Sequence, residues 1–256
     1  MFAQIGFWKE RQYHLDKMTL NELVKAFFQY YAIQAYLVAG VIATYYAITL
    51  HVSVLMSLLA AVIAVVVYPL AWYILHRFVL HGNYLYKNPV TAALWKRIHY
   101  DHHQDPYDLS ILFGALYTTM PTIAAVTLPI GHYLDGWGGA ASAFAAGMFF
   151  TCINEFCHCI MHLSYKPKNK YLRKIKALHL IHHFHNEKAN YGITNYEWDR
   201  LFGNYYPDQT QLDKSPTVFD LGYTAEMAEK YPWVSKLSGG VSHNGPRERR
   251  KAVQKP

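Results

Sequence analysis

The chain has 256 residues, a formal net charge of +7, and a composition of 52% hydrophobic and only 16% charged residues. Soluble domains carry about a quarter charged residues, so this composition disfavours an ordinary soluble enzyme. Aromatic residues, which are counted within the hydrophobic share, make up 16% of the chain and include 22 tyrosines.

Lysine and arginine are absent from two long windows, residues 26–76 and 98–165. Within these windows lie four apolar runs, each close to the roughly 20 residues that a helix needs to cross a hydrocarbon core. The pattern predicts an all-α integral membrane protein with four transmembrane helices in two hairpins. The predicted spans are 31–50, 52–75, 111–131 and 137–157.

The distribution of positive charge predicts the orientation of these spans. The short links at His51 and at 132–135 contain no lysine or arginine, whereas the flanking segments contain all of them. Positively charged segments stay in the cytoplasm, and four crossings return the chain to its starting side. We therefore expect both termini and the segment 76–110 to be cytoplasmic, in a bacterial inner membrane or the endoplasmic reticulum.

The segments next to the spans give further expectations. The start of the chain lacks the apolar core of a cleavable signal peptide. Thr19 and Glu22 form a capping box, which predicts a helix from about residue 20 into the first span. The basic run 166–176 favours anionic lipid headgroups over nucleic acid as a partner. Three cysteines near the end of the fourth span are predicted to be free thiols in a reducing cytosol: Cys152, Cys157 and Cys159.

Ten of the 15 histidines fall into four clusters with helical spacing. Residues i, i+3 and i+4 share one face of an α-helix, so each H-x2-HH cluster would direct three imidazoles the same way. Two copies of that pattern are far more than chance would place in a chain of this length. The clusters are His76 and His81; His99, His102 and His103; His158 and His162; and His179, His182 and His183.

These imidazoles predict a centre with two metal ions. A first-row ion takes about four to six ligands, so ten imidazoles suit two ions better than one. His76 and His81 are five residues apart, about 140° out of phase on an ideal helix, and can share a site only if the helix ends or bulges between them. Imidazole suits zinc, iron, copper and nickel alike, although two nitrogen-rich ions favour a redox pair over a catalytic zinc.

Three further residues are candidates for hydrogen bonds to ligand imidazoles. Glu155 lies three residues before His158, on the same helical face. An equally good interpretation is that Glu155 caps a helix end or pairs with a lysine. Asp101 and His185 are weaker candidates of the same kind.

The order H-x4-H, H-x2-HH, H-x3-H, H-x2-HH resembles the membrane-bound fatty acid hydroxylase and sterol desaturase superfamily. The segment NYGITNYEWDRLFGNYY (190–206) is similar to the closing N-[FY]-G-x-T…D-x-x-F-G stretch of that family. The resemblance covers about residues 50–207. It implies that the ten histidines hold two iron ions, for which zinc could substitute in a purified sample, with O2 as co-substrate and no separate catalytic acid or base.

The resemblance also implies a division of the chain into three parts. Residues 1–27 would be a cytoplasmic N-terminal segment, and 28–207 a fatty acid hydroxylase-type membrane catalytic domain with a cytoplasmic, helical, histidine-rich cap. Residues 208–256 would be a cytoplasmic tail that is partly disordered.

The implied reaction is hydroxylation of an unactivated C–H bond in a membrane lipid, with a fatty acyl or sterol-like substrate. Desaturation and carotenoid hydroxylation on the same scaffold stay open. No haem, flavin or iron–sulfur motif is evident, so a separate electron donor is expected, either a b-type cytochrome or a ferredoxin with its reductase. No nucleic-acid partner is expected.

A membrane metal-binding or transport protein is the alternative from another class. A transporter would place polar ligands near the middle of the bilayer. The predicted spans contain only Gln34, Asn154 and Glu155 as larger polar residues, and the last two lie near a span end. This distribution favours the enzyme.

Overall fold

The computed structural model describes residues 13–246, so the start of the N-terminal segment and the last part of the predicted tail lie outside it. Within this range the chain is helical and has no strand, only an isolated bridge between His14 and Asp108. It divides into two compact units. The histidine-rich unit comprises 13–19, 73–113 and 159–246, and the apolar unit comprises 20–72 and 114–158.

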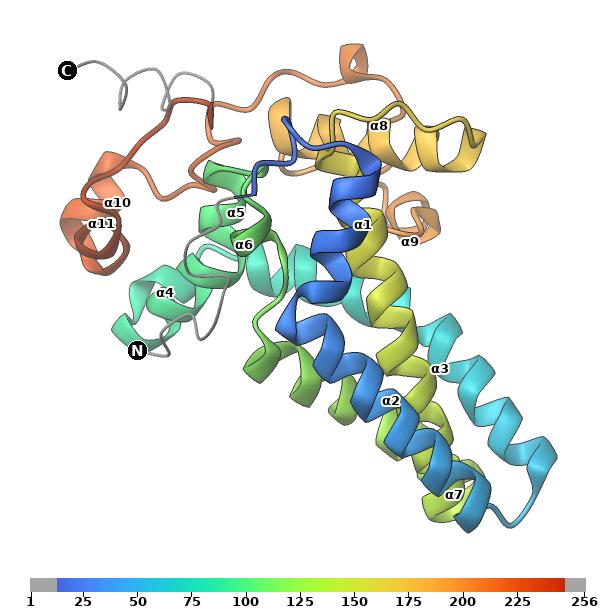
Figure 1. Ribbon diagram of the computed structural model, residues 1–256. Helices are drawn as coiled ribbons and strands as arrows, with labels where there is room; N and C mark the ends of the chain where they lie inside the picture. Colours follow the sequence, from blue (N-terminus) through green and yellow to red (C-terminus); the bar gives the residue numbers. More distant parts are fainter. Residues whose placement is uncertain (1–12, 247–256) are drawn as a thin grey trace. The chain divides into compact units, whose positions relative to one another are not determined.

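The apolar unit begins with helix α1 (Leu20–Gln29), which starts directly after Thr19, as the capping box predicted. The expectation that this helix runs on into the first span was wrong. Tyr30 is extended (φ −74°, ψ 129°) and separates α1 from α2 (Tyr31–Leu50), whose bounds match the first predicted span (Figure 1).

Among residues 13–246, three helical segments are long and apolar enough to cross a membrane by length and composition: Tyr31–Leu50, Val54–Leu80 and Leu109–His162. The second consists of helix α3 (Val54–Ile74) and the π-helical turn η2 (Leu75–Leu80). Large apolar side chains such as Val41 on α2 and Leu55 on α3 are exposed. The chain is an integral membrane protein.

The third predicted span from residue 116 onward and the whole fourth predicted span fall in one long element, α7 (Leu116–His162), which is interrupted at Asp135 and Gly136. Residues 111–112 lie instead in the short helix α6 (Leu109–Leu112), and 113–115 are not helical, so the predicted start of the third span was wrong. Gly136 has φ 56° and ψ −143°, a backbone conformation that glycine adopts without a steric cost. The two arms of α7, residues 116–134 and 137–162, run antiparallel. Gly131 and Gly139 are in such close contact that a Cβ on either would meet the backbone of the other, and a Cβ on Gly147 would lie 2.7 Å from Ile123.

Asp135 joins this interruption to the start of α3. Its carboxylate accepts hydrogen bonds from the backbone N–H groups of Ser53 (2.8 Å) and Val52 (3.3 Å). Helix N-terminal N–H groups have no partner within their own helix, and a carboxylate that satisfies them also opposes the positive end of the helix dipole. Asp135 is buried, so it acts as a cap supplied by a distant part of the chain.

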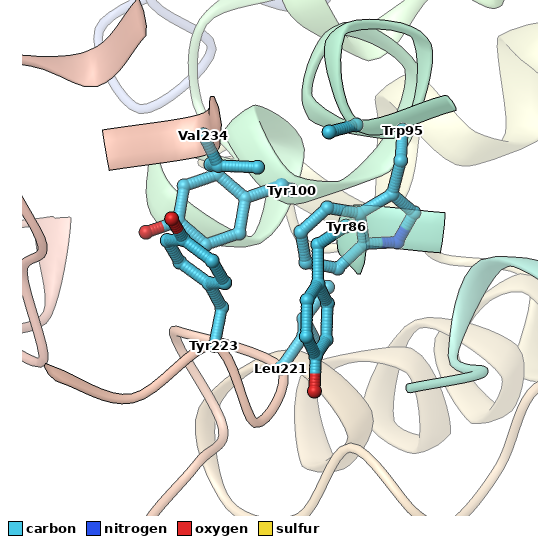
Figure 2. Close-up of a cluster of buried hydrophobic side chains, with 7 residues drawn as sticks. Tyr86, Trp95, Tyr100, Leu221, Tyr223 and Val234 are labelled. Atoms are coloured by element: carbon cyan, nitrogen blue, oxygen red, sulfur yellow. The ribbon is translucent and has the colours of Figure 1, made fainter. Parts of the chain in front are cut away.

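The histidine-rich unit is built from short helices around an aromatic core, in which Tyr86, Trp95, Tyr100 and Tyr223 pack together (Figure 2). Tyr223 comes from the predicted C-terminal tail, so this part of the tail contributes to the core. The indole N–H of Trp95 donates to the Leu80 carbonyl (2.7 Å) and so fixes the end of η2. The other elements of the unit are η3 (Leu85–Lys87), α4 (Pro89–Trp95), η4 (Lys96–Tyr100), α5 (Asp101–Gln104), α6 (Leu109–Leu112), α8 (Lys170–Phe184), α9 (Glu197–Leu201), η5 (Gln209–Gln211), α10 (Ala225–Lys230) and α11 (Trp233–Ser238).

Replacing Asp135 tests its capping role. Asp135→Ala removes the acceptor for the two N–H groups that directly precede α3, and we expect the free energy of unfolding in detergent to fall by about 0.5–2 kcal/mol. Asp135→Asn keeps one acceptor oxygen and should have a smaller effect. Denaturation midpoints that are the same for the alanine variant and the unmodified protein would contradict the assignment.

Candidate metal centre

The first histidine pair is brought together by a π-helical turn. In η2 the N–H of His81 donates to the carbonyl of His76 (3.0 Å), an i→i+5 hydrogen bond. This wider turn places the two side chains on one face, and their Nε2 atoms lie 3.2 Å apart. The prediction that the helix must end or bulge between these residues is confirmed.

Five imidazoles form a first group, here called site A. The potential ligand atoms of His76, His81, His99 and His103 all lie within 4.8 Å of one another. The ring of His182 lies 4.9 Å from that of His76 and 4.8 Å from that of His81, measured between centroids. Site A therefore draws its rings from η2, η4, α5 and α8, and its residues are His76, His81, His99, His103 and His182.

A second group, here called site B, contains His102, His162, His179 and His183. Their potential ligand atoms also lie within 4.8 Å of one another, and the Nε2 atoms of His162 and His179 are 2.9 Å apart. His158 is the last residue of the apolar unit and lies one turn before His162 on α7.

The two sites adjoin through stacked rings. His103 of site A and His183 of site B have centroids 4.1 Å apart and ring planes inclined by only 23°. Potential ligand atoms of His103, His182 and His183 again lie within 4.8 Å of one another. Ions bound at A and B would thus be neighbours.

The environment of the rings favours neutral imidazole, the form that binds metals. Nine of the ten predicted histidines are buried, and His81 is half-buried. Burial, followed by the charge of neighbouring histidines, holds the pKa of His81 well below its usual range. The same two causes lower the pKa of His183. A buried positive charge on these rings would be costly without a counter-ion, so both rings are neutral at pH 7.

Hydrogen bonding shows that the rings present lone pairs to one another. His76 Nδ1 lies 2.6 Å from the Tyr191 carbonyl, which can only accept, so the single N–H of the neutral ring is on Nδ1. Nε2 of His76 then offers a lone pair toward Nε2 of His81. Among residues 13–246, neither ring nitrogen of buried His183 has a hydrogen-bond partner. A cation can be bound by imidazole lone pairs that converge in a buried space, so these residues fit metal ions.

Backbone carbonyls orient two further rings of site A. His182 Nδ1 donates to the Ala189 carbonyl (2.8 Å), and His103 Nδ1 donates to the Val218 carbonyl (3.2 Å). Such contacts fix the tautomer of a ligand histidine and the direction of its other nitrogen. Val218 lies beyond the predicted catalytic domain, and sequence reasoning missed it because a backbone carbonyl leaves no trace in residue identity.

Three residues were predicted to form hydrogen bonds to the imidazoles, and the structure places each of them as follows. Glu155 is buried in the apolar unit, with Oε1 3.4 Å from where a Cβ on Gly114 would lie. Asp101 forms an ion pair with Lys96 (2.7 Å), and His185 Nε2 donates to the Leu212 carbonyl (2.8 Å). The three cysteines are free, as predicted.

Sequence reasoning also missed Asp199, a fully buried carboxylate. It accepts hydrogen bonds from the backbone N–H groups of Tyr191 (2.6 Å) and Gly192 (2.9 Å). Burial raises the pKa of Asp199 to about 7, against the lowering effect of the two N–H groups. Asp199 is the aspartate of the NYG…D stretch, so the resemblance of that stretch to the family was the signal that could have indicated it.

Comparisons with known proteins converge on one family. The fatty acid hydroxylase profile matches residues 61–204. The ceramide very long chain fatty acid hydroxylase of Saccharomyces cerevisiae is 32% identical over 160 residues, which cover 59% of this chain and 39% of that protein. The fatty acid 2-hydroxylase of Homo sapiens is 28% identical over 150 residues, which cover 55% of this chain and 37% of that protein.

A dihydroceramide fatty acyl 2-hydroxylase of Arabidopsis thaliana is 30% identical over 149 residues, 54% of this chain and 57% of that protein. A solved structure of full-length scs7p, in which only the hydroxylase domain is visible, is similar with a TM-score of 0.60 and 29% identity, and the match covers 72% of this chain and 68% of that one. The chain spans less than two fifths of the human protein, 37% of its length.

Metal removal should destabilise the protein. A ligand that binds only the folded state at about 100 times its Kd stabilises that state by about 2.7 kcal/mol. We expect the melting temperature of metal-depleted protein to rise when Zn²⁺ is added. His183→Ala should reduce this rise, whereas His132→Ala, an exposed histidine in the apolar unit, should not. Identical melting curves with and without Zn²⁺ would contradict metal binding at sites A and B.

Proposed function

Because the chain belongs to the fatty acid hydroxylase family, we propose that it hydroxylates an unactivated C–H bond in a membrane lipid. The observation that carries the proposal is the contact between sites A and B, two buried groups of imidazoles with a stacked ring pair at their border. The names of the similar proteins supply the substrate class: ceramide, dihydroceramide and fatty acid hydroxylases. Carbon 2 of a fatty acyl chain is the proposed position.

The proposed cofactor is a pair of iron ions, with zinc as a possible substitute in purified protein. A bound iron pair supplies the activation of O2 that oxidises an aliphatic carbon. Site A offers five imidazoles. Site B offers four. His158 is proposed as its fifth, because His158 and His162 are residues i and i+4 of one helix and therefore share a face. Neutral imidazoles leave the positive charge of the ions uncompensated, and the burial of nine of the ten rings keeps bulk water away from the centre.

The reaction balances with an external reductant. One oxygen atom of O2 enters the C–H bond as hydroxyl, and the other leaves as water with two electrons and two protons. The proposed donor is a b-type cytochrome, or a ferredoxin with its reductase. Exposed Lys170, Arg173 and Lys174 on α8 offer a positive face for an acidic donor of this kind.

Glu155 is a proposed hydrogen-bond partner of a ligand imidazole. It is buried and lies three residues before His158 on the same helix, α7. Asp101 and His185 stay weaker proposals, because each makes a contact elsewhere, with Lys96 and with the Leu212 carbonyl.

We further propose four membrane crossings, with both termini and the histidine-rich unit in the cytoplasm. The antiparallel arms of α7 support two crossings within that element, and α2 and α3 would make the other two. The proposed domain boundaries remain 1–27, 28–207 and 208–256. The contact of Val218 with His103 makes part of the last segment a neighbour of the metal centre.

Labelled oxygen tests the reaction. Cells that express the chain under ¹⁸O2 should accumulate a 2-hydroxy fatty acyl lipid that carries one ¹⁸O atom, and His179→Ala should reduce this product to background. His132→Ala is the matched control and should retain the product. A new double bond without ¹⁸O would indicate a desaturase, a labelled ring hydroxyl on a carotenoid or sterol would change the substrate, and metal uptake without any lipid change would indicate a transporter.

Reporter fusions test the topology. A reporter in the link at 51–53 or in the turn at 135–136 should be active only outside the cytoplasm, because each lies between two proposed crossings. A reporter fused to the C-terminus should be active only inside. If the reporter at 135–136, like the reporter at the C-terminus, is active only inside the cytoplasm, then α7 does not cross the membrane twice.

A further inference from the structure

We infer that Asp199 and Asn190 are positioning residues for site A: they clamp the 189–192 turn, whose carbonyls set the ring orientation of His76 and His182. The inference rests on the proposed metal-binding function. It assigns a role to the NYG…D stretch that neither ligand spacing nor the proposed reaction requires.

The turn controls two of the five rings of site A. The carbonyls of Tyr191 and Ala189 accept from Nδ1 of His76 (2.6 Å) and from Nδ1 of His182 (2.8 Å). A neutral imidazole has one N–H, so each of these hydrogen bonds leaves Nε2 as the free lone pair and fixes its direction. A shift of the turn would rotate both rings, or it would allow the N–H to move to Nε2, which then has no lone pair for a metal ion.

The aromatic side chain of Tyr191 adds a third constraint on site A. Its ring centroid lies 5.1 Å from that of His81, 5.5 Å from that of His182 and 5.7 Å from that of His76. A single residue thus orients one imidazole through its carbonyl and packs edge-on against three. Its backbone position must therefore be defined to within a fraction of an ångström.

Asn190 fixes one side of the turn. Its φ of 55° is left-handed, a conformation that asparagine tolerates better than most residues. Its side-chain amide accepts from the Tyr206 N–H (2.9 Å) and donates to the Tyr206 carbonyl (2.9 Å), while its own N–H donates to the Asn204 carbonyl (3.0 Å). These bonds attach the turn to the chain after α9.

Asp199 fixes the other side with both carboxylate oxygens. Oδ1 accepts from the Tyr191 N–H and Oδ2 from the Gly192 N–H. Successive N–H groups form a concave anion site, here filled by a carboxylate of the protein itself. A Cβ on Gly192 would lie 2.9 Å from Oδ2 and would also collide with the Asn195 carbonyl, so glycine is required for this close approach.

The consequence is a chain of contacts from a buried carboxylate to the metal ligands. Asp199 accepts a hydrogen bond from the N–H of Tyr191, and the carbonyl of Tyr191 accepts one from Nδ1 of His76. The contacts of the turn go to His76, His81 and His182, all members of site A. A loss of the clamp should therefore weaken one metal ion and spare the other, whereas a general loss of folding would release both.

The experiment uses the full chain in detergent, depleted of metal and titrated with Zn²⁺ against a competing chelator. Asp199→Asn replaces one acceptor oxygen by an NH2 group that faces a backbone N–H. We expect the affinity for one Zn²⁺ to fall by about 10–100-fold, the range for lost outer contacts of a ligand histidine. The affinity for the other ion should not change, so that at a free Zn²⁺ concentration buffered between the two Kd values the variant should bind one ion per chain.

Two further variants make the result specific. Asp208→Asn is the matched control, because Asp208 is an exposed aspartate that accepts from the Thr210 N–H (2.9 Å), and it should bind two ions like the unmodified protein. Asn190→Gly keeps the left-handed backbone but removes the amide contacts with Tyr206, and it should reproduce the selective loss of one ion even if Asp199→Asn folds poorly.

The outcomes separate this inference from the proposed function. If the unmodified chain binds two Zn²⁺ and both clamp variants also bind two with unchanged affinity, the clamp has no positioning role. Loss of both ions together, with a large fall in melting temperature in both variants, would make the role purely structural and overturn the inference. An unmodified chain that binds no metal would overturn the proposed function itself.

Discussion

The structure depends on imidazole nitrogens that face one another in a buried space. The Nε2 atoms of His162 and His179 lie 2.9 Å apart, and those of His99 and His81 lie 2.8 Å apart. Neutral rings cannot all donate to each other, and burial makes protonation costly. Cations would relieve this conflict, so we expect binding of the proposed metal ions to be coupled to folding of the histidine-rich unit. The short helices of the unit can then be understood as the means of holding rings that would otherwise separate.

Irregular backbone segments position many of the histidine rings. The π-helical turn η2 carries His76 and ends at His81, and the π-helical turn η4 carries His99. Each turn rotates side chains onto a face that a regular helix would not offer. Carbonyls rather than carboxylates orient the rings of His76, His182 and His103. The carbonyl groups that orient these three rings are neutral, like the imidazoles themselves.

Much of this architecture follows from the sequence, and the remainder has identifiable physical reasons. Uninterrupted apolarity defined α2 to its terminal residues, and helical histidine spacing identified imidazoles that the structure brings together in groups able to hold a metal ion. The break at Tyr30 was missed because backbone conformation there is set without glycine or proline. The carbonyl of Val218 and the clamp of Asp199 were missed because their effect depends on tertiary placement. Spacing also indicated a bulge between His76 and His81, since their angular mismatch leaves no other way to share a site.

The hydrogen bond from His103 to Val218 has a consequence for biosynthesis. These residues are separated by 115 positions in the chain, and the second lies downstream of every ligand histidine. All ten imidazoles are therefore synthesised before the carbonyl that orients one of them. The orientation of His103 by this carbonyl can therefore be completed only after the apolar helices have been synthesised.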